Sequence, residues 1–300
     1  RIQVPIFWGS LYNTPGFTNT GIPNFSESSV PASWEGHFPN WIAADFNGDG
    51  ILRTDQDGVI IDGNGDGIRG IANRVWDEQQ QAFSLGRFGW KAGQPSLMQQ
   101  NAAAFNGDIG ITSLLFSQDH CTHKQSACRE ATSGVDPDGS EVSNKLLGFV
   151  EFYTRHLAVP KRRNLDEPPV QQGDKLFSEL NCDGCHRRHF VTAKRPNLPA
   201  LSEQKIYPYT DLLLHDMGPG LADGRPEYLA SGQHWRTPPL WGLGLTEVVN
   251  GHTQYLHDGR ARNVTEAILW HGGEAEAAKQ AFANLNQSQR EALVAFVNSL

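Results

Sequence analysis

The chain has 300 residues, 38% of them hydrophobic, and a formal net charge of −8 at pH 7. This length and apolar content allow one large or two ordinary domains. The acidic balance, with charges of both signs scattered along the chain, argues against a nucleic-acid-binding surface. No apolar run approaches the roughly 18–20 residues needed to cross a bilayer. The sequence starts at Arg1 with neither an initiator Met nor a leader, so we expect a processed or cut end.

Residues 1–85 are rich in Gly, Pro, Asn and Asp, which predicts loops rather than helices. The pattern D-x-N-x-D-G occurs twice in this region, at Asp45, Asn47 and Asp49 and again at Asp62, Asn64 and Asp66. Alternating oxygen ligands that close on a Gly turn are typical of calcium loops. Position twelve from Asp45 is Gln56 instead of a bidentate Glu, and Asx-rich turns of this kind also form without a metal. The sequence is therefore compatible with two interpretations of these loops, a calcium site and a turn without a metal.

Apolar residues at helical spacing predict a helix over 144–157, and the prolines and charges of 158–169 then predict a linker. A second helix is expected from Val170 to Leu180. The chain ends in a third, with Ser288 and Glu291 in a capping-box pattern and an apolar stripe that includes Leu293 and Phe296. We find no strand-rich block. The fold class is therefore mostly α with long irregular loops, and a domain boundary is placed between residues 160 and 161.

The second helix leads directly into Cys182-Asp183-Gly184-Cys185-His186, a C-x-x-C-H motif. In this motif two thiols add to the vinyl groups of a haem and the adjacent His ligates the iron. A redox-active dithiol would need a βαβ context, and a four-cysteine zinc site would need two close Cys pairs. We therefore predict one covalent haem c on Cys182 and Cys185, with His186 as an iron ligand, in a cytochrome c-like helical domain over 161–300.

The remaining cysteines, Cys121 and Cys128, are seven residues apart and are predicted to form a disulfide that closes a short loop. Disulfides and haem c attachment both occur in oxidising compartments outside the cytosol. The two features together predict a periplasmic or secreted bacterial protein.

Three strings follow in order in the second half: YPYTDLLLHDMGPGLADGR, HWRTPPLWGLGL and YLHDGRARNVTEAILWHGGEA. They resemble the C-terminal haem domain of the di-haem c-type oxidoreductases of the peroxidase or thiol-oxidoreductase type. These are distant relatives of bacterial di-haem cytochrome c peroxidases and of the methylamine-utilisation enzyme that matures a tryptophan-derived cofactor. The resemblance extends over about residues 70–300.

The resemblance also implies a second axial ligand. In the peroxidase relatives it lies fourteen residues after the His of a His-x-Gly step, and here His257-Asp258-Gly259 places His271 at that position. Asn263 and Glu266 can cap a short helix over 264–270 that ends just before it. Met217 and His215 are alternative candidates for this ligand, and a coordination position without a protein ligand is a further alternative. Arg236 and Arg260 are candidate partners of the haem propionates.

In the first half the resemblance assigns Trp90 to a position between two haems, and Gln100 and Asp108 to the pocket of a catalytic haem. A carboxylate beside a peroxide can accept one proton and return it to the leaving oxygen. Residues 1–150 nevertheless contain no second C-x-x-C-H. We therefore expect either a fragment, whose residues 1–160 are a loop-rich segment that completes a missing first-haem domain, or a mono-haem carrier.

The predicted function is thus electron relay. The haem on Cys182 and Cys185 accepts an electron from a donor protein, a small cytochrome or a cupredoxin, and passes it to an upstream catalytic haem domain not encoded in this chain. The alternative is a stand-alone mono-haem c-type electron carrier without catalysis.

Overall fold

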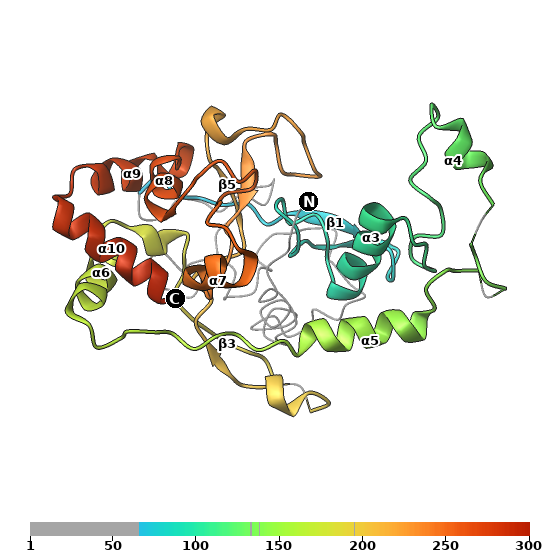
Figure 1. The fold of residues 1–300 in the computed structure, drawn as a ribbon, viewed down its shortest axis with the longest axis horizontal. Coiled ribbons are helices and arrows are strands. Elements are labelled where there is room, and N and C mark those ends of the chain that lie inside the picture. The colour runs from blue at the N-terminus through green and yellow to red at the C-terminus, as the bar shows by residue number, and fades with distance from the viewer. Residues whose placement is uncertain (1–65, 133, 138, 195) are drawn as a thin grey trace.

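The computed structural model describes residues 66–132, 134–137, 139–194 and 196–300. The regular structure of this part of the chain is mainly helical, with a few short strands, and long loops join the elements (Figure 1). This agrees with the predicted class of helices and long irregular loops. The helices are α3 Leu97–Ile109, α4 Ser126–Glu130, α5 Asn144–Arg155, α6 Pro168–Glu179, α7 Thr246–Asn250, α8 Val264–Leu269, α9 Glu276–Ala283 and α10 Gln287–Ser299. None of the helices in the described ranges is long and apolar enough to span a membrane.

The strands form three separate two-stranded antiparallel sheets. They are β1 Arg74–Asp77 with β2 Ala82–Leu85, β3 Phe190–Val191 with β4 Lys205–Ile206, and β5 Leu214–Asp216 with β6 His234–Arg236. The expected absence of a strand-rich block therefore holds for the described residues.

The main core lies between α6 and α10, which cross at the left of the molecule in Figure 1. Phe177 of α6 packs against Phe296 of α10 with ring centroids 5.2 Å apart, and both side chains are buried. The helices approach so closely at Gly173 that an added Cβ would lie 2.0 Å from the Ala292 carbonyl oxygen. The predicted helix from Val170 to Leu180 is thus confirmed, and its buried stripe faces the C-terminal helix.

The cap of α10 differs from the predicted one. Asn286 is the N-cap: its side chain accepts a hydrogen bond from the Gln289 amide, and the Gln289 side chain accepts one in return from the Asn286 amide. The predicted pair, Ser288 and Glu291, lies two residues later, inside the helix. Asn286 takes the cap because its backbone is still extended, as an N-cap requires.

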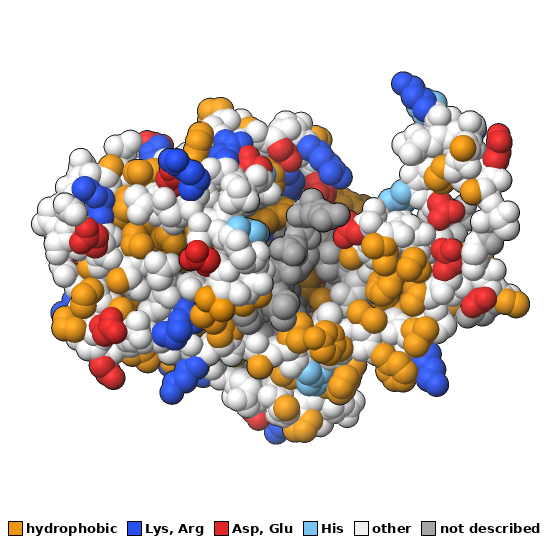
Figure 2. Space-filling model, in the orientation of Figure 1, with side chains coloured by type: hydrophobic (Ala, Val, Ile, Leu, Met, Phe, Trp, Pro, Cys, Tyr) orange, Lys and Arg blue, Asp and Glu red, His pale blue; other side chains and the backbone are white. Residues whose placement is uncertain are grey.

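Helix α5 lies on the other side of the molecule from α6 and α10, joined to them by an extended segment (Figure 1). That segment is the predicted linker, and it is anchored: the Arg163 amide donates to the Ser299 carbonyl at 2.9 Å. The outer face of α5 is apolar and exposed, and such side chains gather over it in the space-filling view (Figure 2). They are Leu146, Phe149, Phe152 and Tyr153.

Residues on both sides of the predicted boundary at 160/161 are hydrogen-bonded to each other. Ile71 forms a β-bridge with Leu214, and the buried Asn73 side chain donates to the carbonyls of Lys91 and Glu227 at 2.7 and 3.2 Å. The segment that contains β1 and β2 therefore packs on the part of the chain that contains β5 and β6.

Cys121 and Cys128 form a disulfide with Cα atoms 5.8 Å apart, as predicted. It closes a loop beside α4, which stands away from the body of the molecule (Figure 1).

Candidate haem site

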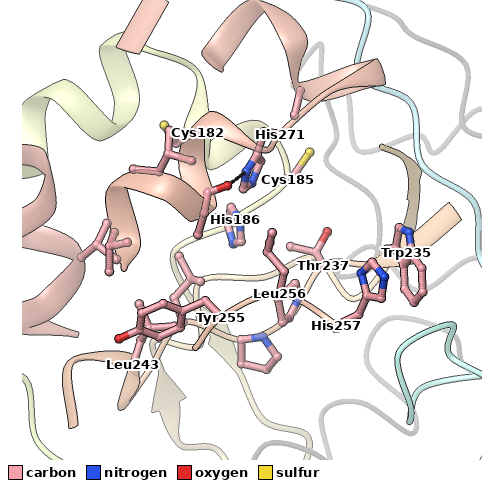
Figure 3. A pocket seen from close by; sticks show the side chains of 18 of the residues that line it. Cys182, Cys185, His186, Trp235, Thr237, Leu243, Tyr255, Leu256, His257 and His271 are labelled. Atoms are coloured by element: carbon pink, nitrogen blue, oxygen red, sulfur yellow. Dashed lines mark hydrogen bonds between the residues drawn. The ribbon is translucent and has the colours of Figure 1, made fainter. Parts of the chain in front are cut away.

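A cavity of about 590 Å³ lies between α6, α8, α10 and the loops around β5 and β6. This volume falls within the range of small-molecule and cofactor sites. Its walls are mainly apolar, with Leu293 and Val297 from α10 and Val264 and Ile268 from α8. Cys182, Cys185, His186 and His271 all line it, and the two imidazoles point into the same space (Figure 3). The structure therefore brings together the four principal residues predicted from the sequence.

His186 follows the short 3-10 helix η1, Cys182–Gly184. Its Nδ1 lies 3.0 Å from the Tyr209 carbonyl oxygen, and burial lowers the pKa of the ring to about 4. The imidazole is therefore neutral at pH 7. Because a carbonyl only accepts, Nδ1 carries the hydrogen and donates it, which leaves a lone pair on Nε2. This is the tautomer that ligates a metal through Nε2.

His271 shows the same arrangement from a different element. It follows α8, and its Nδ1 lies 2.7 Å from the Ala267 carbonyl oxygen one turn earlier. Burial lowers the pKa of this imidazole too, so the ring is neutral with its lone pair on Nε2. Helix α8 begins as predicted, with the Asn263 side chain accepting from the Glu266 amide at 2.9 Å.

The turn after His271 is fixed by close packing. Gly273 has φ +55°, and an added Cβ would lie 2.1 Å from the Asp216 carbonyl oxygen. A side chain at this position would therefore push the turn away from the end of β5.

Both thiols of the motif are free and line the cavity. Burial, followed by the charge of Asp183, raises the pKa of the Cys182 thiol to about 12. Burial likewise raises the pKa of Cys185. Two half-buried thiols and two neutral imidazoles around one apolar cavity form the kind of donor set that attaches and ligates a haem c.

The rival ligands His215 and Met217 also line the cavity. The His215 ring is buried between two carboxylates, with Nδ1 2.8 Å from Glu274 Oε2 and Nε2 2.9 Å from Asp211 Oδ2. Neither ring nitrogen could bind a metal without giving up a carboxylate partner. Met217 has no such competing partner for its sulfur among the described residues.

The two predicted propionate partners lie in different settings. Arg236 is buried in the cavity wall, where its Nε donates to the Gly89 carbonyl at 2.8 Å. Arg260 is not among the described residues that line the cavity. It pairs with Asp258, and its guanidinium lies 4.8 Å from the centroid of the Trp270 ring.

The predicted catalytic residues of the first half are spread over a larger region. Trp90 lines the cavity, and its carbonyl accepts from the Arg236 amide at 2.8 Å. Gln100, in α3, is half-buried. Asp108, near the end of the same helix, is exposed. Of these three, Trp90 is the one that the structure places beside the cavity.

Five of the six predicted calcium ligands lie outside the described residues: Asp45, Asn47, Asp49, Asp62 and Asn64. The sixth, Asp66, accepts hydrogen bonds from the Ile68 amide and the Asn181 side chain, both at 2.9 Å. No group of three or more His, Cys, Asp or Glu side chains in the described ranges is placed to hold a metal ion. The calcium site stays a prediction.

Sequence reasoning missed a stacked group at the edge of the cavity. The rings of Trp235 and His257 are stacked, with centroids 3.7 Å apart and an interplanar angle of 13° (Figure 3). Lys91 Nζ lies 4.3 Å from the centroid of Trp235 and is bonded to Asp223 at 2.9 Å. These contacts join residues that lie far apart in the sequence, and no local pattern indicates them.

The family model described as "Di-haem oxidoreductase, putative peroxidase" matches residues 51–300. Among solved structures, the chain is similar to the hydrazine synthase of Kuenenia stuttgartiensis pressurized with 20 bar xenon. The identity is 19% and the TM-score 0.35, covering 54% of this chain and 57% of that chain, a similarity too weak to indicate a shared fold. This chain thus spans little more than half the length of that chain. No curated protein matches it. The family match extends over most of the sequence, and the chain belongs to the di-haem oxidoreductase family.

Proposed function

We propose that this chain is the electron-transfer part of a di-haem oxidoreductase. It would hold one haem c through thioethers to Cys182 and Cys185, with His186 and His271 as axial ligands. The observation that carries the proposal is the pair of neutral, half-buried imidazoles, each donating from Nδ1 to a backbone carbonyl beside two free thiols in one cavity.

When bound, the haem supplies one-electron redox chemistry at its iron. The residues of the chain determine how that chemistry is used. The carbonyls of Tyr209 and Ala267 hold the two rings in the tautomer that presents Nε2. The apolar walls from α8 and α10 would limit the access of water to the haem. Two imidazole ligands leave no open position for peroxide, which suits relay better than catalysis.

The catalytic haem is proposed to lie outside this sequence. The family is di-haem, yet these 300 residues contain one C-x-x-C-H motif. Trp90 would then carry the electron towards the second haem, with Gln100 and Asp108 contributing to its pocket. In this reading residues 161–300 are a cytochrome c-like domain, and residues 1–160 complete the pocket of the other haem. The disulfide and the thioethers support a periplasmic or secreted location.

The second candidate is a stand-alone mono-haem carrier. The single motif and the exposed position of Asp108 favour it, because a carboxylate that serves peroxide chemistry is normally enclosed. The two candidates differ in the number of haems in the complete native protein.

The test is the covalent haem content. The chain is produced with c-type maturation machinery and denatured, and haem is counted by pyridine haemochrome and intact mass. We expect one haem per chain, and none in the Cys182→Ala/Cys185→Ala variant. The control, Cys121→Ser/Cys128→Ser, removes the other cysteine pair and should keep the haem. A haem-free wild-type chain that instead contains zinc would overturn the proposal.

A further inference from the structure

The hairpin that follows His186 presents an exposed face with its own chemistry. It projects from the body of the molecule at β3 (Figure 1). Val191 pairs with Lys205 across β3 and β4, so their side chains lie on one face, whereas Phe190, on the opposite face, is buried. His189 and Tyr207 extend the exposed face by the same alternation, and their ring centroids are 5.9 Å apart. Val191 is 54% and Tyr207 43% exposed, so this face is open to a partner.

Positive charge surrounds these rings. Lys205 Nζ lies 5.3 Å from the centroid of Tyr207, and Lys194 is exposed in the hairpin loop. Burial first, and then the charges of Lys205 and Arg187, lower the pKa of His189. We call this surface the hairpin patch; it consists of His189, Val191, Lys194, Lys205 and Tyr207.

Acidic residues are scarce in the sequence around the hairpin patch. Asp174 and Asp183 pair with Arg188, which is not part of it. Between 187 and 207, Glu203 is the one acidic residue in the sequence. The hairpin patch is therefore locally positive on a chain whose net charge is −8.

The hairpin patch is joined to the haem site by a short path. Tyr207 precedes Tyr209 by two residues, and the Tyr209 carbonyl accepts from His186 Nδ1 at 3.0 Å. The Thr210 amide also donates to the Arg187 carbonyl at 2.9 Å, which closes the base of the hairpin. An electron arriving at Tyr207 would thus need to pass two peptide units and one hydrogen bond to reach the His186 ring.

We propose that the hairpin patch is the docking surface for a small acidic electron-transfer protein. Such a partner is repelled by the net negative charge of the rest of the chain and attracted here, so charge fixes its orientation as well as its place. One electron passes from the partner to the iron, which is reduced as the partner is oxidised, and no atom is transferred. This inference rests on the proposed electron-transfer function and adds to it the point of entry and the class of donor.

The test uses small redox ions of opposite charge, because they sense local potential without requiring the natural partner. Haem content is first confirmed by pyridine haemochrome, and a chain without haem would refute the proposed function itself. The ferrous protein is then oxidised in a stopped-flow instrument by hexacyanoferrate(III), an anion, or by tris(phenanthroline)cobalt(III), a cation. The double variant Lys194→Glu/Lys205→Glu is compared with Lys124→Glu/Lys145→Glu, which changes the net charge equally at exposed sites far from the hairpin.

We expect hexacyanoferrate(III) to react faster as the ionic strength falls, despite the net charge of −8. The hairpin variant should slow this reaction by roughly tenfold at low ionic strength and accelerate the cobalt complex, while the control variant stays within about twofold of wild type. An acidic flavodoxin hydroquinone, used as a protein probe on the ferric form, should show the same order of rates. Equal rates for the two double variants in a haem-loaded protein would overturn this inference and leave the haem assignment intact. Faster reduction by basic ferrous cytochrome c than by flavodoxin would also overturn it.

Discussion

His215 Nδ1 lies 2.8 Å from Glu274 Oε2, and this contact joins strand β5 to the turn that follows His271. Glu274 also accepts hydrogen bonds from the backbone amides of Arg69 and Asp216, at 2.7 and 3.1 Å. On its other side, His215 contacts Asp211. The cluster thus connects three segments around the cavity, and it lies beside Cys185, whose Sγ is 3.7 Å from His215 Nδ1.

The charge on His215 predicts a pH-dependent stability. Burial by itself lowers the pKa of the ring, but the Cys185 sulfur and the Asp211 carboxylate outweigh it and raise that pKa well above its ordinary value. With Cys185 in a thioether, the two carboxylates remain to hold the proton. A raised pKa stabilises the fold fully below the unfolded value of about 6.5, and this stability is lost as the pH rises through the folded pKa.

We therefore expect the unfolding free energy of the haem-loaded protein to fall above pH 6.5, by at most about 1.4 kcal/mol per pH unit from this group. His215→Gln should abolish that slope. At pH 6 it should also cost about 3–5 kcal/mol, because the buried Asp211 and the half-buried Glu274 lose their cation. Denaturant titrations at a series of pH values measure both effects, with His252→Gln, at an exposed position, as control. Parallel pH profiles for wild type and His215→Gln would contradict the assignment.

The packing of α6 on α10 can be tested at a single position. Gly173→Ala would place a Cβ 2.0 Å from the Ala292 carbonyl oxygen and 2.6 Å from the Phe296 Cβ. Because backbone atoms cannot turn aside, we expect a loss of about 1–3 kcal/mol of unfolding free energy. Gly148→Ala, in α5, meets no atom within 4 Å and should be neutral or stabilising by up to about 1 kcal/mol. Equal effects of the two changes in thermal or denaturant unfolding would show that the helices do not touch at Gly173.

The sequence could predict those features that depend on local pattern. Amphipathic spacing identifies α6 and α10, because each buries one stripe of side chains. It also identifies α5, although Leu147 is the one buried residue of that helix. The C-x-x-C-H motif identifies the thiols and His186, because the chemistry of attachment requires that spacing. The family resemblance identifies His271, which lies 85 positions after His186 in the sequence and lines the same cavity.

The rest could not be predicted, for physical reasons. The rings of His186 and His271 donate to backbone carbonyls, which every residue possesses. The side chains of Tyr209 and Ala267 therefore give no indication that their carbonyls accept these hydrogen bonds. The carboxylates around His215 come from 4 and 59 residues away in the sequence. The charge of Arg260 indicates an anion partner but not which one, and the structure pairs it with its neighbour Asp258.

The second axial ligand is tested by His271→Ala. If His271 ligates the iron through Nε2, its loss opens a coordination position, and the ferric haem should become at least partly high-spin. Absorption and electron paramagnetic resonance spectra measure the change. Met217→Leu, the matched change at the rival ligand, should leave the low-spin spectrum intact. The reverse pattern, with Met217→Leu altering the spectrum and His271→Ala leaving it unchanged, would move the ligand to Met217.

The role of Trp90 can be separated from that of Trp235, since both line the cavity. Lys91 Nζ lies 4.3 Å from the centroid of the Trp235 ring, and a cation over the ring opposes removal of an electron from it. Trp90 is therefore the better candidate to carry an electron between haems. In the complete protein with both haems, Trp90→Phe should slow inter-haem transfer by about tenfold or more and leave both haem spectra unchanged. A tenfold slower rate corresponds to an increase of about 1.4 kcal/mol in the activation free energy of the transfer. Because Lys91 opposes the oxidation of Trp235, Trp235→Phe should leave the rate within about twofold of wild type. Flash-reduction kinetics measure both, and a slower rate in Trp235→Phe alone would assign the path to the stacked Trp235–His257 pair instead.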